Sequence, residues 1–309
     1  MKATAPQHLS VATRGPKVKR PWLAPGLVRW ALNVPAVAVT FAIPACIHKS
    51  NTNPAITITR AEAHAELKRL AAQPKALARP VVVLNGYHTP HFMIAGLGER
   101  LRTATSGRAS DFLIVSYVDA TNLNDAAERV VRAVQERWPS SKAGETVPVD
   151  VVGLSMGGIV ARLAAIPARE RPTVDGAPMW KGEDAPTGAR LNVVRLFTLA
   201  SPHGGARLAR IAALDDAARA MRAGSAFLNR LDEALPRAEY ALLCYAHTGD
   251  VTVGARHAAP VGVTPIWTDG TVMFSHGAIV ENPWFAADIA RRLRGDEPLL
   301  TPGEPPPRD

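Results

Sequence analysis

The chain has 309 residues, of which 47% are hydrophobic and 20% are charged, a composition that excludes a fibrous, disordered or disulfide-stapled protein. The net charge of +9 would suggest nucleic-acid binding, but eight basic residues precede the first acidic residue, Glu62. The remainder carries 28 basic and 27 acidic residues. We therefore expect no folded surface with the excess positive charge that binding nucleic-acid phosphates requires.

Residues 1–60 are predicted to be a targeting or anchor segment. A basic stretch precedes an apolar run, residues 31–47, which is interrupted by Asn33, Pro35 and Pro44. That run is shorter than the roughly 20 residues of a membrane-spanning helix and suits the apolar core of a secretory signal. Its end, Ile-Pro-Ala-Cys, resembles a bacterial lipoprotein cleavage box with Cys46 as the lipidated residue. We expect a secreted or cell-envelope protein, with this segment cleaved and lipidated, kept as a membrane anchor, or left as a disordered tail.

Strand-like and helix-like segments alternate from residue 61 onward. Short β-branched or apolar runs, each long enough for a buried strand, occupy residues 81–84, 112–117, 147–154, 193–198 and 242–245. A last strand is expected near residues 265–271. Helical spacing occupies residues 94–101, 124–138, 155–164 and 279–293. This alternation predicts one α/β domain over residues 61–294, with a mostly parallel sheet and helices on both faces.

Two stretches interrupt the alternation and a third follows it. Residues 167–190 are rich in proline, glycine and charge and predict a long surface excursion. Residues 204–238 contain an Ala- and Arg-rich helical segment between two strands, and predict a lid-like insertion. The Pro-rich end, residues 295–309, is predicted to be disordered. Cys244 lies in an apolar run and is expected to be a buried core residue and not a nucleophile.

The sequence Gly153-Leu-Ser155-Met-Gly157-Gly158 lies between a strand-like run and a helical segment. A nucleophilic serine needs its hydroxyl exposed at the carboxyl edge of a sheet, and a sharp strand-to-helix turn presents it there. Glycine on either side lets the strand and helix approach each other, and the helix N-terminus then lies under the developing oxyanion. The pattern predicts Ser155 as a nucleophile, with a glycine-rich structural turn as the alternative.

Four stretches, in this order, resemble the lipase and esterase branch of the α/β-hydrolase superfamily over roughly residues 79–293. Residues 81–87 resemble the strand whose terminal His-Gly pair supplies half of an oxyanion hole, with Asn85 in place of the histidine. Residues 153–158 resemble the nucleophile turn. Residues 196–204 are similar to a Thr-Pro-His-x-Gly stretch of lipases, and residues 221–228 to a segment of bacterial lid regions. We expect the Asn85 amide to hydrogen-bond the loop and preserve its geometry.

The resemblance implies a catalytic triad in the order serine, acid, histidine. Asp250 follows the penultimate strand and matches the acid, with Asp269 as its rival. His276 precedes the final helix and matches the base. His203, within the third matching stretch, is expected to be structural.

The resemblance also implies an oxyanion hole formed by the backbone N–H groups of Tyr87 and Met156. The side chain of Tyr87 would line the substrate pocket, although an ordinary strand-to-loop junction is the alternative. Met221, Phe227 and Leu228 could face an acyl chain or, equally, pack the insertion onto the sheet.

The expected activity is hydrolysis of an ester or lipid ester by a monomer that needs no cofactor. His88 and His91 are separated by Thr-Pro, which opposes a regular helix, and no third ligand presents itself, so no metal site is predicted. The same triad would serve an acyltransferase, a thioesterase or amidase, or a lipid esterase similar to the GPI-inositol deacylases. The alternative from another class is a catalytically silent hydrolase fold that acts as an envelope binding protein.

Overall fold

The computed structural model describes residues 53–117, 120, 122–172, 188–210, 215–270 and 274–308. The apolar run at 31–47, Cys46 and most of the predicted excursion, residues 173–187, lie outside these residues. Secretion, lipidation and anchoring through the N-terminal segment therefore stay predictions. None of the helices in the described part has the length and apolar character needed to cross a membrane.

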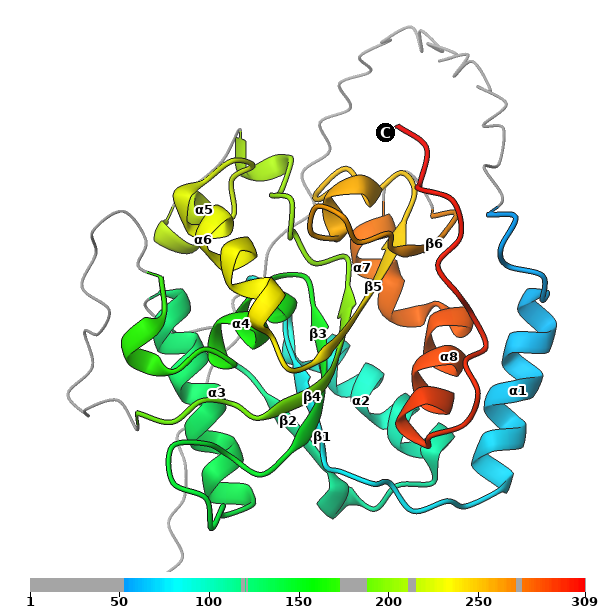
Figure 1. Cartoon of the computed structure of the whole chain (residues 1–309). Coiled ribbons are helices and arrows are strands. Elements are labelled where there is room, and N and C mark those ends of the chain that lie inside the picture. Colours follow the sequence, from blue (N-terminus) through cyan, green and yellow to red (C-terminus); the bar gives the residue numbers. More distant parts are fainter. Residues whose placement is uncertain are drawn as a thin grey trace, which may run out of the picture. The chain divides into compact units, whose positions relative to one another are not determined.

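Six parallel strands form one sheet in the order β2-β1-β3-β4-β5-β6 (Figure 1). The strands are β1 (Val81–Leu84), β2 (Phe112–Val115), β3 (Val149–Leu154), β4 (Val193–Leu199), β5 (Ala241–His247) and β6 (Ile266–Thr268). Each hydrogen-bonded pair is parallel, so the carboxyl ends of all six strands meet at one edge. Both β1 and β3 are buried throughout, which explains why β1 is a continuous apolar run and why β3 is apolar or glycine except for Asp150, whose buried carboxylate pairs with Arg79 and Arg195.

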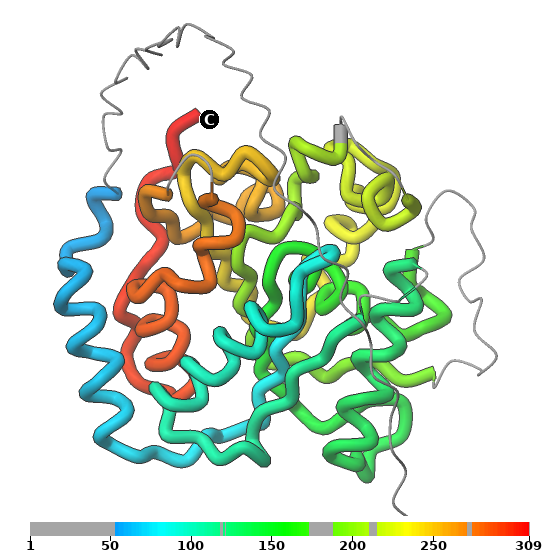
Figure 2. Tube along the Cα trace, turned by 180° about the vertical axis from the view of Figure 1, so that it is seen from behind, coloured from blue at the N-terminus to red at the C-terminus, as the bar shows by residue number. Residues whose placement is uncertain are grey.

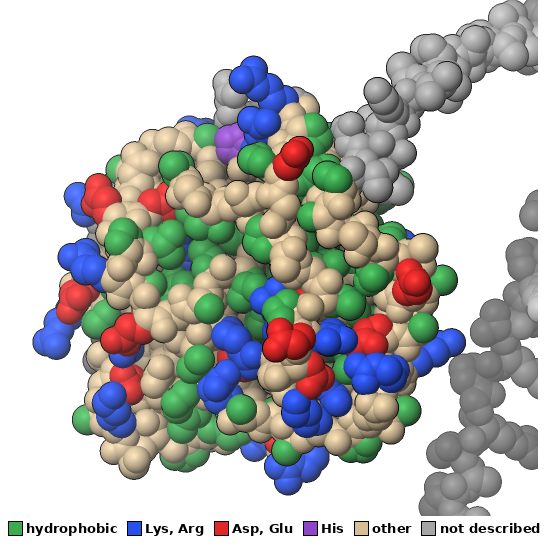
Figure 3. All heavy atoms as spheres, turned by 45° about the vertical axis from the view of Figure 1, so that its right-hand side comes forward, with side chains coloured by type: hydrophobic (Ala, Val, Ile, Leu, Met, Phe, Trp, Pro, Cys, Tyr) green, Lys and Arg blue, Asp and Glu red, His purple; other side chains and the backbone are tan. Residues whose placement is uncertain are grey.

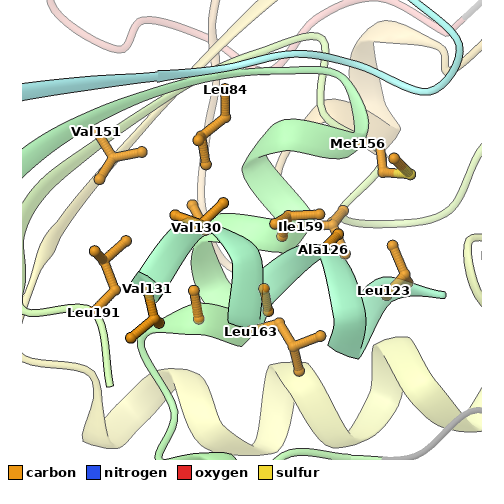
Figure 4. Close-up of a cluster of buried hydrophobic side chains, with 14 of the residues drawn as sticks. Leu84, Leu123, Ala126, Val130, Val131, Val151, Met156, Ile159, Leu163 and Leu191 are labelled. Atoms are coloured by element: carbon orange, nitrogen blue, oxygen red, sulfur yellow. The ribbon is translucent and has the colours of Figure 1, made fainter. Parts of the chain in front are cut away.

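Helices cover both faces of the sheet, as predicted. One face packs against α3 (Leu123–Arg137) and α4 (Met156–Ala164), and Figure 4 shows the side chains that fill this interface. The other face packs against α2 (His91–Thr105) and α8 (Pro283–Leu293). Alternate residues of β1 serve the two sides, with Val82 in the first cluster and Val83 in the second. The buried apolar area of both faces thus holds the strand ends in place.

Helix α1 (Arg60–Ala72) packs beside α8, as Figures 1 and 2 both show. Thr59 caps α1 in a reciprocal capping box with Glu62. Ion pairs join this region to the end of the chain, including Glu66–Arg291 and Lys75–Asp296. On the face that Figure 3 shows, basic and acidic side chains are interspersed.

Helix α8 begins later than predicted, because two short elements precede it. They are α7 (Ser275–Ala278) and a 3-10 turn, Ile279–Glu281. The side-chain oxygen of Asn282 accepts from the N–H groups of Trp284 and Phe285 and so caps α8. Pro283 occupies the first helical position, where its missing N–H costs nothing. The expected helix from residue 279 is therefore divided at Asn282.

Two predicted boundaries of the folded unit are wrong. The side chain of Asn53 is buried, and its Nδ2 donates to the Trp267 carbonyl at 2.8 Å, so residues 53–60 belong to the folded unit and not to the leader. The Pro-rich end is ordered over residues 295–308. Leu300 is buried, and its N–H donates to Asp288 Oδ1 at 2.9 Å. Proline lacks an N–H donor but keeps its carbonyl acceptor, and the carbonyl of Pro306 accepts from Arg256 Nε at 2.9 Å.

The insertion between β4 and β5 contains α5 (Asp216–Ala220) and α6 (Ala226–Ala234) instead of one long helix. Gly224, which has a φ of 74°, lies between them and permits the left-handed turn that divides the segment. The insertion shares the apolar cluster formed by α3 and α4. Met221, Phe227 and Leu228 are buried in that cluster, which favours packing over contact with an acyl chain.

Candidate active site

Ser155 lies at the turn between β3 and α4, where its φ of 51° and ψ of −121° are strained for a residue with a side chain. Close approach of the strand and helix explains the glycines around it. A Cβ atom on Gly153 would lie 2.6 Å from the backbone N of Gly158. One on Gly157 would lie 2.7 Å from the carbonyl O of Leu84. The strand-turn-helix context predicted from the sequence is confirmed.

The three residues predicted as a triad lie together, with His276 within hydrogen-bonding distance of both Ser155 and Asp250. Nε2 of His276, in α7, is 2.9 Å from Oγ of Ser155. Nδ1 of the same imidazole is 2.8 Å from Oδ2 of Asp250, in the loop after β5. With the proton on Nδ1, the ring donates to the carboxylate and leaves Nε2 free to accept the serine proton. This arrangement can convert a hydroxyl into a nucleophile near neutral pH.

Asp250 is held as a carboxylate by three partners, His276 and the backbone N–H groups of Thr252 and Val253. Its Oδ1 accepts from the N–H groups of Thr252 at 2.9 Å and Val253 at 3.1 Å. Burial raises the pKa of this carboxyl, but the hydrogen bond and charge of His276 and the two N–H donors outweigh burial, and the pKa lies below its usual value. The rival acid, Asp269, is exposed and accepts from the hydroxyl of Thr248. The geometry therefore favours Asp250.

Three features identify the fold. The parallel sheet has the order β2-β1-β3-β4-β5-β6, a strained serine lies in the turn after β3, and a histidine follows the last strand. The chain has the α/β-hydrolase fold. No protein-family model matches the sequence, and no curated protein matches it.

The chain is similar to several solved structures at low sequence identity. The mature lipase BlEst2 of Bacillus licheniformis is 16% identical, covers 68% of this chain and 89% of its own, and has a TM-score of 0.44. Phospholipase PlaB of Legionella pneumophila is 12% identical, with 70% and 60% covered and a TM-score of 0.49. A truncated carbohydrate esterase from gut microbiota is 11% identical, with 72% and 88% covered and a TM-score of 0.44.

His203 is buried in a polar network behind the serine turn. Its Nε2 lies 3.2 Å from Thr198 Oγ1, and its Nδ1 lies 3.1 Å from the guanidinium of Arg162. Burial, together with the positive charge of Arg162, lowers the pKa of His203 well below its usual value. A neutral histidine with both nitrogens engaged acts as a structural link between β4 and α4, as the sequence predicted.

His247 supports the loop that carries His276, a contact that the sequence analysis missed. Its Nδ1 lies 2.9 Å from the carbonyl of Ser275, and its Nε2 lies 2.8 Å from Nδ2 of Asn282. The hydroxyl of Ser275 donates to the carbonyl of Thr248 at 3.2 Å. These bonds fix Ser275, at the start of α7, and Asn282, the cap of α8, to the end of β5. Two polar residues near His276 in the sequence, Ser275 and Asn282, were the available signal. Their partners lie 27 to 35 positions away in sequence, so no local pattern links them.

The predicted oxyanion donors flank Ser155 in this hydrolase fold. Met156 is the first residue of α4, so its N–H has no acceptor within the helix. Tyr87 follows Gly86, whose added Cβ would lie 3.1 Å from Cβ of Ser155. The loop after β1 therefore touches the serine turn at Gly86, one residue before Tyr87.

The expected role of the Asn85 amide is wrong. Its side chain is fully buried, and neither its Oδ1 nor its Nδ2 has a hydrogen-bond partner in the part of the chain that the structure describes. The hydroxyl of Tyr117 instead donates to the backbone carbonyl of Asn85 at 2.6 Å. The side chain of Tyr117, two residues after β2, thus holds the loop through the main chain of Asn85 and not through its carboxamide.

Two cavities lie beside the site. The smaller, about 40 Å³, is lined by Tyr87 and Met156 on one side and by Asp215 of the insertion on the other. The hydroxyl of Tyr87 donates to Asp215 Oδ2 at 2.7 Å. Burial and the Asp215 carboxylate raise the pKa of Tyr87 to about 12, so the phenol keeps its proton at neutral pH. The larger cavity, about 480 Å³, contains His276 and Phe92 in its lining.

Proposed function

We propose that this chain is a serine ester hydrolase with Ser155 as nucleophile, His276 as general base and acid, and Asp250 as the residue that orients the imidazole. The line of two hydrogen bonds from Ser155 through His276 to Asp250 carries this proposal. The four sequence stretches that resemble lipases and esterases support an ester as the substrate. The strained turn at Ser155 adds support, because such strain is typical of functional positions.

In the acylation step, Ser155 Oγ forms a bond to the ester carbonyl carbon while its proton passes to Nε2 of His276. Collapse of the tetrahedral intermediate breaks the bond between that carbon and the alcohol oxygen, which takes the proton from His276 as it leaves. In the second step, water gives one proton to His276 and attacks the acyl carbon with its oxygen. The acid is released, and the proton returns to Ser155.

Electrostatics favours both steps. The low pKa of Asp250 keeps a negative charge beside His276, which stabilises the imidazolium formed in each tetrahedral intermediate. The backbone N–H groups of Tyr87 and Met156 would donate to the oxyanion. Each such donor typically lowers the barrier by about 3–4 kcal/mol. The same groups would serve attack by an alcohol in place of water.

A fluorophosphonate probe followed by peptide mass spectrometry tests the proposal. We expect covalent labelling of Ser155, and loss of both labelling and p-nitrophenyl acetate hydrolysis in Ser155→Ala. The matched control is Ser110→Ala, which removes an exposed serine hydroxyl remote from His276 and should keep parental turnover. Hydrolysis that persists unchanged in Ser155→Ala would refute the assignment. Absence of labelling in a folded parent protein would favour the silent binding protein.

A further inference from the structure

Among the cavities that the described residues line, two that include residues of the proposed site differ in volume. The cavity beside Tyr87 and Met156 has a volume of about 40 Å³, whereas the groove beside His276 has about 480 Å³. A water molecule in the liquid occupies about 30 Å³. The first space thus holds only a few non-hydrogen atoms, while the second can hold a sizeable organic group.

Reaction chemistry determines which part of an ester would face each space. The carbonyl oxygen must point toward the N–H groups of Tyr87 and Met156, where negative charge develops. The alcohol oxygen must lie near Nε2 of His276, because it takes the proton from that atom when it leaves. The alcohol portion therefore extends toward the groove beside His276. The acyl portion is left on the side of Tyr87.

The groove beside His276 is apolar at its mouth. Phe92 is 75% exposed, Val251 60% and Phe274 73%, and all three line the groove. They are three of the five large hydrophobic side chains that are exposed in the described residues. Met93 and Val280 line it further. Exposed apolar side chains gathered in this way mark a binding surface for an apolar group.

One lining side chain of the small cavity, that of Tyr87, is held by a hydrogen bond. The Tyr87 hydroxyl bonds to one carboxylate oxygen of Asp215. The other oxygen accepts from the N–H of Ala218 at 2.8 Å and caps α5. The phenol ring is thereby tied to the insertion, and its volume limits the space left for an acyl chain.

We propose that this protein prefers esters of short acyl groups with a larger apolar alcohol, the alcohol binding in the groove of Phe92, Val251 and Phe274 and the acyl chain limited by Tyr87. This inference rests on the proposed function, because it assumes acyl transfer to Ser155. It names the substrate class for that reaction.

Two ester series measure the preference in the parent protein. With the alcohol fixed as p-nitrophenol, we expect kcat/KM to fall about tenfold or more from acetyl to octanoyl, because added methylenes overpack the small cavity. With the acyl group fixed as acetyl, kcat/KM should rise about fourfold for each of the first methylenes added to a linear alcohol. Octanoyl esters cleaved as fast as acetyl esters, or no rise with alcohol length, would overturn the inference.

Variants test which residues set the limits. Tyr87→Ala should raise the octanoyl-to-acetyl ratio of kcat/KM by about tenfold, whereas Tyr87→Phe, which keeps the ring, should leave the ratio within about twofold. Phe92→Ser should weaken the rise with alcohol length. Val261→Ser, at a 94% exposed residue outside the groove, should reproduce both parental profiles. An unchanged acyl ratio in folded Tyr87→Ala would show that Tyr87 does not limit the acyl chain.

The proposed substrate class and the proposed hydrolase activity can be refuted separately. If the fluorophosphonate labels Ser155 but long acyl chains are preferred, only the substrate class is wrong. If the folded protein is not labelled and cleaves no ester of either series, the proposed hydrolase activity is wrong as well.

Discussion

The serine turn depends on the absence of a side chain at Gly153, and Gly153→Ala tests this dependence. The added Cβ would lie 2.6 Å from N and 2.8 Å from Cα of Gly158, and 2.7 Å from C of Gly157. All three atoms belong to the backbone of α4, so no rotation of a side chain relieves the contact. The helix must move away from β3 and take Ser155 with it.

The size of the effect follows from the clash. Overpacking of this kind costs about 1–3 kcal/mol, which for a domain of this size corresponds to a decrease in Tm of about 2–12 °C. A shift of about 1 Å in Oγ relative to His276 can lower the reaction rate about a hundredfold. Both consequences arise from one methyl group placed against α4.

Urea unfolding and the rate of fluorophosphonate labelling measure the two consequences. The control for stability is Gly96→Ala in α2, where an added Cβ meets no atom within 4 Å. There the substitution should increase the free energy of unfolding by about 0.5–1 kcal/mol, because alanine is the better helix former. If Gly153→Ala unfolds at the parental midpoint and is labelled at the parental rate, the close-approach explanation of the turn is refuted.

Four further outcomes are expected. Asp250→Asn should lower kcat by about 10⁴ with an unchanged circular dichroism spectrum, since the imidazole loses the carboxylate that selects its tautomer; a small effect would disqualify Asp250 as the acid. The same substitution should alter acid stability. The pKa of Asp250 in the folded protein lies below the unfolded value of about 3.9, so its stabilisation is complete above about pH 4 and is lost as the pH falls through the folded value. Unfolding free energies measured from pH 6 to 2 should therefore fall less steeply in the variant. Asp288→Ala should cost about 3–5 kcal/mol in urea unfolding, because it leaves the hydroxyl of Tyr245 and the charge of Arg292 without their buried partner; a midpoint near that of the parent would contradict this. Burial raises the pKa of Cys244 to about 12, so iodoacetamide should modify this thiol in denaturant only.

Local patterns in the sequence predicted the parts of the fold that depend on neighbouring residues. The six strands and the serine turn were found because buried parallel strands are largely apolar and because glycine is needed where α4 meets β3. Asp250 and His276 were identified through their order along the chain. That order matches a family pattern, but it gives no distance.

Contacts between distant residues could not be read in the same way. The bond from Asn53 to Trp267 joins residues 214 positions apart, and that from Tyr87 to Asp215 joins residues 128 apart. Neither pair has a pattern of spacing that marks it. The prediction of a disordered C-terminal segment was wrong for a related reason. It rested on proline content, which does not show that the buried Asp288 carboxylate accepts from the N–H groups of Leu299 and Leu300.

The register of the sheet explains why the three site residues meet. The N–H of Ser155 donates to the carbonyl of Leu199 at 2.8 Å, and the N–H of Ala200 donates to the carbonyl of Tyr245 at 2.9 Å. These bonds align the end of β3 with the end of β4, and the end of β4 with β5, five residues before Asp250.

A slip of one residue in either pairing would move Asp250 about 3.3 Å along the strand direction relative to Ser155. That displacement exceeds the tolerance of a hydrogen bond. The buried side chains of β3 and β4 oppose such a slip, because it would move each of them into the apolar cluster on the opposite face, which is packed around other side chains. The packing that fixes the register of the sheet therefore also aligns Asp250 with Ser155.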